Sequence, residues 1–430
     1  MVFPSLSGTV KTPFLNLEKI FLDNQNKIES WFRAQWHHHT PPFYGSVDLR
    51  NSGFKFAPID MNLFPGGFNN LNPDAIPVAV VAAQRSVERL CPEAAKVLLI
   101  PENHTRNTFY LENVYAIQHI LEQAGLQVRL GSLNPEITCP TTFETAMGNQ
   151  VTLEPIIRKK DRIILADGFN PCLVLLNNDL SAGIPEILLD TKQAVLPPLQ
   201  GGWYTRKKTE HFHFYDLIAK EFADLVGVDP WLINPYFAGC SGIDFHEHAG
   251  EEELAQKVSE TLDKIRIKYK ENNIDKEPFV IVKADSGTYG MGIMSVYAPE
   301  DVLGLNRKKR NKMAVVKEGL EVNDVIIQEG VYTFERVQEA VAEPVVYMMD
   351  RCVIGGFYRV HSDRSETENL NAVGMHFVPV SFESHALPNK KGEIDCACNR
   401  FYTYGVIARL SLLAASLELE NKPEPHRLQP

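Results

Sequence analysis

The sequence predicts an α/β protein in which a parallel-sheet unit accompanies a second unit built around a glycine-rich hairpin. Residues 96–100 and 126–130 are buried-type strands that flank an amphipathic helix at 111–123, which is the order of an α/β unit. Residues 279–283 and 293–296 are apolar runs separated by a glycine-rich turn. The length of 430 residues predicts two or three domains.

The composition narrows the classes of partner. Acidic residues number 54 and basic residues 43, so the formal net charge is −11, which argues against nucleic acid as the main partner. No apolar run is long enough to span a bilayer and no signal peptide is expected, so a membrane is not expected as a partner either. The seven cysteines are odd in number and scattered, which favours reduced thiols and a cytoplasmic location.

The glycine-rich hairpin carries the strongest chemical signal. Lys283 ends the first strand, and the turn that follows contains Ser286, Gly287, Gly290 and Gly292. A glycine-rich turn exposes backbone N–H groups that can approach phosphate oxygens, and a lysine at its base adds a positive charge. The segment therefore predicts a phosphate-binding hairpin. The alternative is a hairpin whose glycines serve only the geometry of the turn.

Two familiar nucleotide-binding motifs do not fit this hairpin. A Walker A loop places Lys and then Ser or Thr after its last glycine, whereas Ile293 and Met294 follow Gly292. A dinucleotide-binding fingerprint places a third glycine three residues after Gly292 and a helix beyond it, whereas Ser295 stands there in a strand-like run. These differences argue against a P-loop enzyme and against a dehydrogenase.

A second apolar strand with polar residues follows the hairpin at residues 325–331. It is interrupted by Gln328 and Glu329 and ends at Val331. Such a strand can offer backbone groups to an adenine edge and an acid to a ribose, and the alternative is a plain strand end.

Two apolar runs within residues 343–360 read as antiparallel strands joined by a tight turn, with Arg359 near the end of the second. The order of a strand-end lysine, a glycine-rich hairpin, a Gln-Glu strand and a strand pair with arginine resembles the ATP-grasp family, in particular glutathione-synthetase-like ligases. The resemblance implies that Lys283 and the glycine turn hold the ATP phosphates, that the Gln-Glu strand contacts the adenosine, and that Arg359 lies near the transferring phosphate. It also implies a second phosphate-binding lysine upstream, and both Lys207 and Lys208 fit that place.

ATP-grasp enzymes usually end with acidic residues and an asparagine that bind magnesium, and no good copy of this ending follows residue 375. The N-terminal segment carries a similar pattern, with Asp48, Asp60 and Asn62. The resemblance therefore implies a circularly permuted ATP-grasp-like fold, in which the N-terminal strands complete the ATP site and these residues hold Mg²⁺. Carboxylate and amide oxygens are suitable ligands for Mg²⁺. The alternative is that all three are turn-forming polar residues.

Most of the chain also resembles one bacterial family of glutamate–cysteine ligases. The resemblance rests on residues 48–55, 60–70, 177–181, 202–208 and 283–292. It implies ATP-dependent formation of γ-glutamylcysteine, with ATP and Mg²⁺ as cofactors, glutamate and cysteine as small-molecule partners, and a homo-oligomer left open. Another carboxylate–amine ligase with the same ATP site remains an alternative. So does a non-catalytic ATP-binding module, although such a module would not need the N-terminal acids.

An amino-acid pocket needs acidic groups for the α-ammonium and a cation for the α-carboxylate. Loop position gives six candidates for this pocket, namely Arg50, Asn51, Asn103, Arg106, Asn178 and Asp179. The alternative is that these are ordinary solvated loop residues.

These assignments divide the chain into five segments. Residues 1–74 are expected to complete the ATP and Mg²⁺ site, and residues 75–200 to form an additional α/β substrate domain. Residues 201–277 are expected to be a helical part of the small ATP subdomain. Residues 278–420 are expected to form the ATP-grasp core with a buried C-terminal helix, and residues 421–430 a loose tail.

Overall fold

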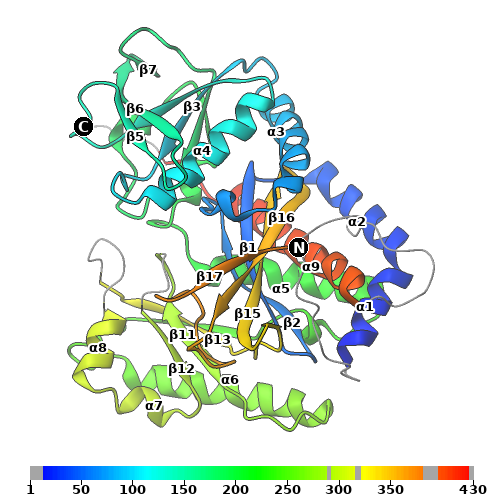
Figure 1. Ribbon diagram of the computed structural model, residues 1–430. Coiled ribbons are helices and arrows are strands. Elements are labelled where there is room, and N and C mark those ends of the chain that lie inside the picture. The colour runs from blue at the N-terminus through cyan, green and yellow to red at the C-terminus, as the bar shows by residue number, and fades with distance from the viewer. Residues whose placement is uncertain (1–12, 288–291, 315–320, 381–395, 426–430) are drawn as a thin grey trace.

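A computed structural model describes residues 13–287, 292–314, 321–380 and 396–425. Within these ranges three β-sheets follow one another along the molecule, and helices back the middle sheet (Figure 1). The helices are α1 (Pro13–Asp23), α2 (Gln25–His38), α3 (Ile76–Leu90), α4 (Thr108–Gln123), α5 (Lys208–Val226), α6 (Glu251–Glu271), α7 (Glu300–Leu303), α8 (Arg307–Ala314) and α9 (Cys396–Glu420). Short 3₁₀ turns lie at Phe68–Asn70, Pro73–Ala75, Glu186–Leu188, Leu199–Gly201 and Pro230–Leu232.

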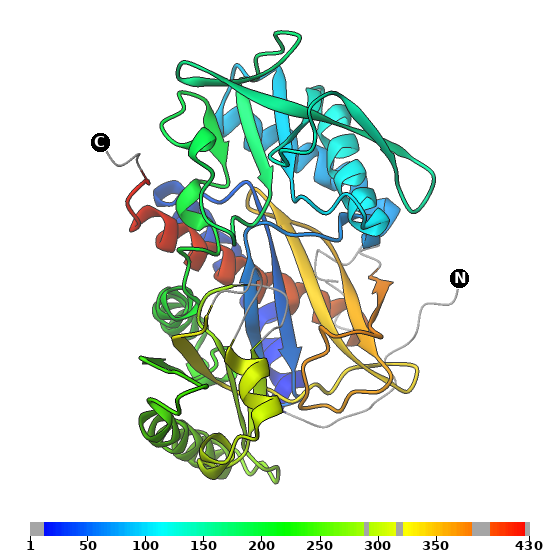
Figure 2. The same cartoon turned by 90° about the vertical axis from the view of Figure 1, so that its left-hand side faces the viewer.

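The middle sheet joins the two ends of the chain. Its strand order is β17-β16-β15-β1-β2, and β14 also pairs with β15. The strands are β1 (Tyr44–Asn51), β2 (Phe56–Asn62), β14 (Arg336–Val337), β15 (Ala340–Met349), β16 (Cys352–His361) and β17 (His376–Pro379). β1 runs antiparallel to β15, with Ser46 opposite Tyr347. The predicted union of the N-terminal strands with the C-terminal strand pair is therefore confirmed, and Figure 2 shows the blue and gold strands side by side.

The sheet of the expected substrate domain is mostly parallel. Its order is β5-β6-β4-β3-β8-β9, with β7 paired to β6. The strands are β3 (Lys96–Pro101), β4 (Gln127–Ser132), β5 (Thr141–Glu144), β6 (Gln150–Lys159), β7 (Arg162–Leu165), β8 (Leu173–Asn177) and β9 (Ala194–Leu196). β3 pairs in parallel with both β4 and β8, which confirms the predicted α/β unit. β7 departs from the parallel arrangement, because it is the antiparallel partner of β6.

The third sheet contains the predicted hairpin. Its order is β10-β13-β11-β12, all antiparallel, with bounds β10 (Phe237–Ser241), β11 (Val280–Ala284), β12 (Ile293–Val296) and β13 (Asp324–Glu329). Lys283 pairs with Ile293 across the hairpin. The sequence did not predict β10, because its Ala-Gly-Cys-Ser core lacks the apolar alternation of a strand. This sheet takes strands from both sides of residue 277, where a domain boundary was expected.

The C-terminal helix α9 lies within the largest apolar core of the described residues. Its side chains are apolar on every face, so it is expected to be surrounded by protein. Val406, Ile407, Leu410 and Leu413 are all completely buried, which confirms the predicted buried helix. α9 packs on β1, β2, β15 and α5 (Figure 2). The middle sheet is thus held rigidly from behind, and its other face is free to form a site.

Among the residues described, none of the helices has the length and apolar character needed to cross a bilayer.

Candidate active site

A cavity of about 850 Å³ lies where the three sheets meet. Its lining includes residues from β1, β2, β15 and β16 of the middle sheet, from the hairpin, and from the carboxyl ends of β3 and β8. Eight predicted site residues that line it are Asp48, Asp60, Asn62, Lys208, Lys283, Ser286, Gly287 and Arg359. Asp179, a ninth predicted site residue, also lines this cavity. Residues more than three hundred positions apart therefore share one cavity, as the permutation hypothesis requires.

The predicted metal-binding residues share one face of the strand pair β1–β2. Asp48 lies directly opposite Asp60, and Ser46 lies opposite Asn62. Alternate residues of a strand point to the same face, so the two carboxylates and the amide project together into the cavity. The Asn62 Oδ1 atom accepts a hydrogen bond from the Phe64 amide at 2.9 Å, which fixes the orientation of the amide. These are hard oxygen donors of the kind that Mg²⁺ prefers.

The two carboxylates differ in electrostatic environment. Burial raises the pKa of Asp48, and the attraction of Arg359 opposes this only in part. Burial also opposes ionisation of Asp60, but the charges of Lys283 and Lys208, with smaller contributions from Arg206 and His211, outweigh it and hold the pKa of Asp60 below its ordinary value. Asp60 is therefore the more firmly ionised of the pair, and it faces the cationic side of the cavity.

Arg359 is held between two acids on the same sheet. Its NH1 group donates to Asp48 Oδ2 and to Glu343 Oε1, each at 2.7 Å, and Glu343 in turn accepts from Arg50 Nε at 2.9 Å. Glu343 is completely buried. Glu343 was not predicted as a site residue, because an acid next to an apolar run resembles an isolated surface residue. The Arg359 Nε atom is buried and has no hydrogen-bond partner among the residues that the structure describes.

The hairpin lysine reaches across to the N-terminal strands. The Lys283 Nζ atom donates to the carbonyl oxygen of Ile59 at 2.7 Å. Burial lowers the pKa of Lys283, while Asp60 and Asp48 partly restore it. The buried cation thus lies beside the acidic face of β2, where charges interact more strongly than they do in bulk water.

The structure distinguishes the two candidate lysines before α5. Lys208 lines the cavity, where its Nζ donates to the carbonyl oxygen of Gly287 at 2.7 Å and lies 4.3 Å from the centre of the Trp203 ring. Burial lowers the pKa of Lys208 to about 8, with Asp60 opposing the shift. Lys207 instead forms an ion pair with Asp324 at 2.7 Å and is half exposed. Adjacent residues point in different directions, so only one of the pair enters the cavity.

Asp285 ties the hairpin to the start of α5. Its carboxylate accepts from the Thr209 amide at 2.8 Å and from the Thr209 hydroxyl at 2.7 Å, and its backbone oxygen accepts from the Lys208 amide at 2.8 Å. The first turn of a helix lacks internal partners for its N–H groups, so this carboxylate acts as a cap supplied by a distant segment. Nothing local in the sequence could indicate a cap that comes from 76 residues away.

Two glycines of the hairpin turn have backbone conformations that favour glycine. Gly287 and Gly292 adopt φ values of +88° and +60°, which side chains rarely adopt, so glycine is required there for the turn. Gly290 lies outside the described residues.

The predicted adenosine contacts lie away from the cavity. Glu329 accepts from Lys55 Nζ at 2.8 Å, from Trp231 Nε1 at 3.0 Å and from the Tyr236 amide at 2.9 Å, deep in the protein. This arrangement is that of a structural carboxylate. Gln328 is buried, and its Nε2 atom has no partner within the described part of the chain, whereas the Val331 oxygen accepts from Arg50. A contact of this strand with adenosine stays a prediction.

Most of the predicted amino-acid contacts have other partners. Arg50 is buried against Glu343, and the Asn51 Nδ2 atom donates to Glu335 at 2.9 Å. The Asn178 side chain accepts from the Leu180 amide of its own loop and donates to the oxygen of Pro101 at the end of β3. Asn103 and Arg106 are exposed and are not among the lining residues. Asp179 alone of the six lines the cavity.

A polar network at the carboxyl ends of β3 and β8 was not predicted. The Tyr110 hydroxyl donates to the Asn177 oxygen at 2.8 Å and accepts from the Glu102 amide at 2.8 Å. The Asn113 Nδ2 atom donates to Asn177 Oδ1 at 2.9 Å. In open α/β sheets, ligands bind at this edge. The signal available in the sequence was the position of Asn177 at the end of an apolar strand.

The middle sheet also contributes an aromatic surface to the cavity. Tyr347 and Phe357 lie on the same face as Arg359, with ring centres 5.3 Å apart, and the Phe357 and Phe377 rings are 4.8 Å apart. Met375 completes this part of the lining. One wall of the cavity is therefore apolar, directly beside the charged groups.

The fold and the cavity together are typical of an enzyme that acts on a phosphorylated substrate. Two buried lysines and an arginine line the same cavity as the paired carboxylates, which suits the binding of phosphates and the stabilisation of charge during phosphoryl transfer.

Comparison with known proteins narrows this class. The sequence model of the GshA family, described as glutamate-cysteine ligase, matches residues 18–419. A crystal structure from Methylobacillus flagellatus, provisionally named gamma-glutamylcysteine synthetase, is 60% identical with a TM-score of 0.91 and covers 98% of this chain and 99% of its own. The chain belongs to the glutamate–cysteine ligase family, and it is by that membership an ATP-dependent ligase.

More distant structures add no argument. A glutathione synthetase-like effector of Globodera pallida is 11% identical with a TM-score of 0.40, over 87% of this chain and 84% of its own. The D-alanyl-alanine synthetase A of Vibrio cholerae is 10% identical with a TM-score of 0.34, over 74% and 81%. No match was found among curated proteins.

Proposed function

We propose that this chain joins the γ-carboxylate of L-glutamate to the amine of L-cysteine with hydrolysis of ATP, giving γ-glutamylcysteine, ADP and phosphate. One observation carries the proposal beyond the family. Lys208 and Lys283 line the same cavity as Asp48, Asp60 and Arg359, although they come from three separate parts of the chain. Such a set can bind a triphosphate and neutralise the charge that moves during transfer.

The chemistry has two steps. The glutamate γ-carboxylate attacks the γ-phosphorus of ATP, so an acyl phosphate forms as the bond to ADP breaks. The cysteine amine then attacks the acyl carbon, the bond from that carbon to the phosphate oxygen breaks, and the amine proton leaves to the phosphate or to water. Neither step needs a nucleophile from the protein, so the residues act by positioning and by charge.

The chain's own groups would divide this work. Lys208 and Lys283 would bind the phosphates, with the backbone of the turn at Ser286 and Gly287 close to the same oxygens. Arg359 would stabilise the transferring phosphoryl group. These assignments are supported by the position of all five residues in the cavity lining.

We further propose that Asp48, Asp60 and Asn62 bind Mg²⁺. When bound, the ion would neutralise phosphate charge and polarise the transferring group. Among the described residues, no group of three or more His, Cys, Asp or Glu side chains is placed to hold a metal ion. The proposed site consists instead of two carboxylates, Asp48 and Asp60, and the amide of Asn62. Mg²⁺ is commonly bound by one or two carboxylates together with substrate phosphates, so the set fits an ion that arrives with ATP.

The two amino acids would occupy different walls. Asp179 and the polar network around Tyr110 suit the charged groups of glutamate. The wall of Tyr347, Phe357 and Met375 suits the small, weakly polar side chain of cysteine, since thiols pack well against aromatic and thioether groups. A contact of the Gln328 strand with the adenosine remains part of the proposal.

The proposed compartment is the cytoplasm. Cys91, Cys139, Cys172, Cys240 and Cys352 are all free thiols, as expected in a reducing compartment.

The proposal is tested by ATP-dependent phosphate release from the full chain with single amino acids and with pairs, with and without Mg²⁺. Release that needs glutamate, cysteine and Mg²⁺ together, and that yields a thiol dipeptide, is the expected result. Release with glutamate and a different amine would replace cysteine as the acceptor. Nucleotide binding without release for any pair would instead favour a non-catalytic module.

A further inference from the structure

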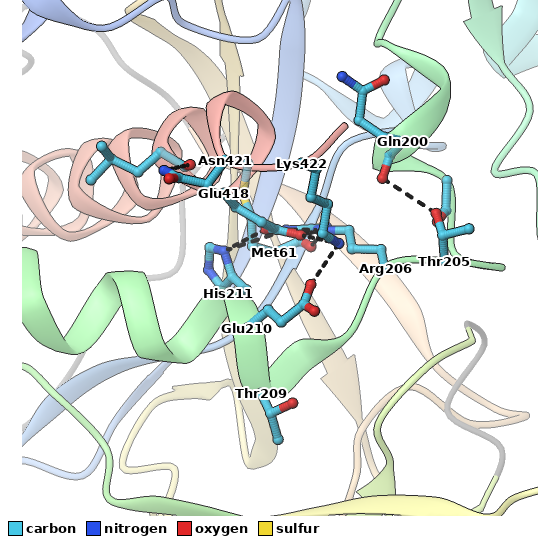
Figure 3. Close-up of polar contacts among 12 residues, drawn as sticks. Met61, Gln200, Thr205, Arg206, Thr209, Glu210, His211, Glu418, Asn421 and Lys422 are labelled. Atoms are coloured by element: carbon cyan, nitrogen blue, oxygen red, sulfur yellow. Dashed lines mark hydrogen bonds and ion pairs between the residues drawn. The ribbon is translucent and has the colours of Figure 1, made fainter. Parts of the chain in front are cut away.

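A buried ion pair lies directly behind the proposed ATP site. Arg206 is 1% exposed and Glu418, near the end of α9, is completely buried. The guanidinium donates through Nε to Glu418 Oε1 at 2.9 Å and through NH2 to Glu418 Oε2 at 2.9 Å, which is a two-pronged contact (Figure 3). His211 Nδ1 lies 3.4 Å from the same carboxylate. The Glu418 pKa is held well below its usual range, because Arg206 and His211 outweigh the effect of burial.

The remaining nitrogen of the Arg206 guanidinium, NH1, contacts strand β2. This NH1 group donates to the carbonyl oxygen of Met61 at 2.6 Å (Figure 3). Met61 stands on β2 between Asp60 and Asn62, both of which line the cavity. The position of Arg206 therefore sets the position of this stretch of backbone.

The same arginine is linked to Lys208 on its other side. Arg206 and Lys208 both pack on the Trp203 ring, at 4.9 Å and 4.3 Å from its centre. His211, in the first turn of α5, is within 3.3 Å of Arg206 NH2. Arg206 thus lies at a junction that joins the acidic face of β2 to the start of the helix that presents the phosphate-binding lysine.

Stability alone does not explain this junction. Withdrawal of two charges from water is costly, and well-packed apolar residues often replace such a pair without loss of stability. A fixed fork of donors, however, can hold three separate segments in one geometry. The contacts made here are to the C-terminal helix, to β2 and to α5, and two of these segments carry proposed ATP-site residues.

We propose that Glu418, acting through Arg206, is a positioning residue for the binding of Mg²⁺ and ATP. Glu418 holds the guanidinium, which holds the Met61 carbonyl and the start of α5, so that Asp60 and Lys208 keep the separation that the nucleotide phosphates require. The inference rests on the proposed function. It predicts that disruption of the pair impairs nucleotide binding far more than amino-acid binding.

The test compares Glu418→Gln with a matched variant that breaks another arginine pair of the same helix, α9. Glu29 forms a two-pronged pair with Arg409 of α9, with distances of 2.8 Å and 2.7 Å, but it belongs to α2 and does not line the cavity. The affinity of the full chain for Mg²⁺ with ATP is measured by calorimetry, and the KM values for glutamate and cysteine are measured at saturating ATP. Thermal unfolding verifies that each variant is folded.

We expect E418Q to weaken the binding of Mg²⁺ with ATP about tenfold, because Asp60 and Lys208 would no longer be held at the separation that the phosphates require, while the KM values for the amino acids change less than about twofold. E29Q should leave all three values within about twofold. Should E418Q fail to fold, Arg206→Lys carries the test, since a lysine keeps the charge beside Glu418 but cannot also reach Met61, and the same selective loss is expected.

Two results would overturn the inference. One is a folded E418Q or R206K that binds Mg²⁺ with ATP as tightly as the unmodified chain. The other is a uniform loss in E418Q and E29Q alike, which would make the pair a general stabiliser. An unmodified chain that binds no ATP at all would instead overturn the proposed function, and the positioning role with it.

Discussion

Lys283 donates a hydrogen bond to the carbonyl oxygen of Ile59 at 2.7 Å, although 224 residues separate the two in sequence. The bond fixes the end of the hairpin strand β11 to the N-terminal strand β2, one residue before Asp60. It is the contact through which the N-terminal strands and the glycine-rich hairpin become one site. The proposed function depends on this hydrogen bond, because a phosphate-binding cation and a metal-binding carboxylate must act on the same nucleotide.

Lys208, rather than Lys207, should govern ATP binding. The change Lys208→Met removes a buried cation from the cavity, and loss of one such group is expected to lower kcat/KM for ATP about 100-fold. Lys207→Met removes only a half-exposed pair with Asp324, so its effect should stay within about threefold. Steady-state kinetics with ATP as the varied substrate provides the comparison. Equal losses in the two variants would contradict the geometry of the start of α5.

ATP affinity should fall as the pH rises through about 8. Burial lowers the pKa of Lys208 to about 8 in the free protein, so its charge is present below this pH and is lost above it. Since a neutral amine binds phosphate poorly, the dissociation constant for ATP should rise between pH 7.5 and pH 9 by up to about tenfold per pH unit above the pKa. Direct binding without amino acids avoids the titration of cysteine itself.

The matched variant for this pH profile is Lys208→Arg, whose guanidinium stays charged throughout the range. It should bind ATP with a nearly flat profile. If the profile of K208R retains the same inflection as the unmodified chain, a group other than Lys208 is responsible.

Asp60 should determine the Mg²⁺ requirement. It faces Asp48 across the strand pair and is the more firmly ionised of the two. The change Asp60→Asn is expected to raise the Mg²⁺ concentration for half-maximal ATP binding about tenfold or more. Exposed Asp74, altered to Asn, serves as the control and should leave the requirement unchanged. A Mg²⁺ titration unaffected by D60N would remove Asp60 from the metal site.

Glu329 should behave as a structural residue. Its carboxylate and Lys55 form a pair whose side chains are each 1% exposed, so Glu329→Gln leaves a buried charge without its partner. We expect the free energy of unfolding to fall by about 3–5 kcal/mol. Urea unfolding of E329Q beside the exposed-site control Glu339→Gln measures the difference. A stable E329Q with a selectively raised KM for ATP would support the alternative, a contact with the adenosine.

The sequence allowed the hairpin and the acidic strand pair to be predicted, because each is defined by local alternation of apolar and polar residues. The strand of Lys283 and the turn at Gly287 are short-range patterns, and so are Asp48 and Asp60 on their strands. The buried helix α9 was also predictable from a local pattern, because its apolar residues surround the helix axis.

The amino-acid pocket was not predictable, because its composition depends on contacts between distant segments. Arg50 and Asn51 stand beside an acidic pattern and resemble ligand contacts, yet each is bonded to a glutamate more than 280 residues away. Glu343 and Tyr110 carry no local mark of a site, and only the fold brings them to the cavity. The choice between Lys207 and Lys208 likewise depended on which of two neighbours points inward.

The transfer of oxygen from glutamate to phosphate tests the proposed chemistry most directly. The full chain is supplied with ATP, Mg²⁺, cysteine and glutamate that carries ¹⁸O in its γ-carboxylate, and the released phosphate is analysed by mass spectrometry. An acyl phosphate requires that one ¹⁸O atom enters the phosphate for each dipeptide formed, because the carbon–oxygen bond breaks when the amine attacks. Dipeptide formed with unlabelled phosphate, or with ¹⁸O in AMP, would contradict it.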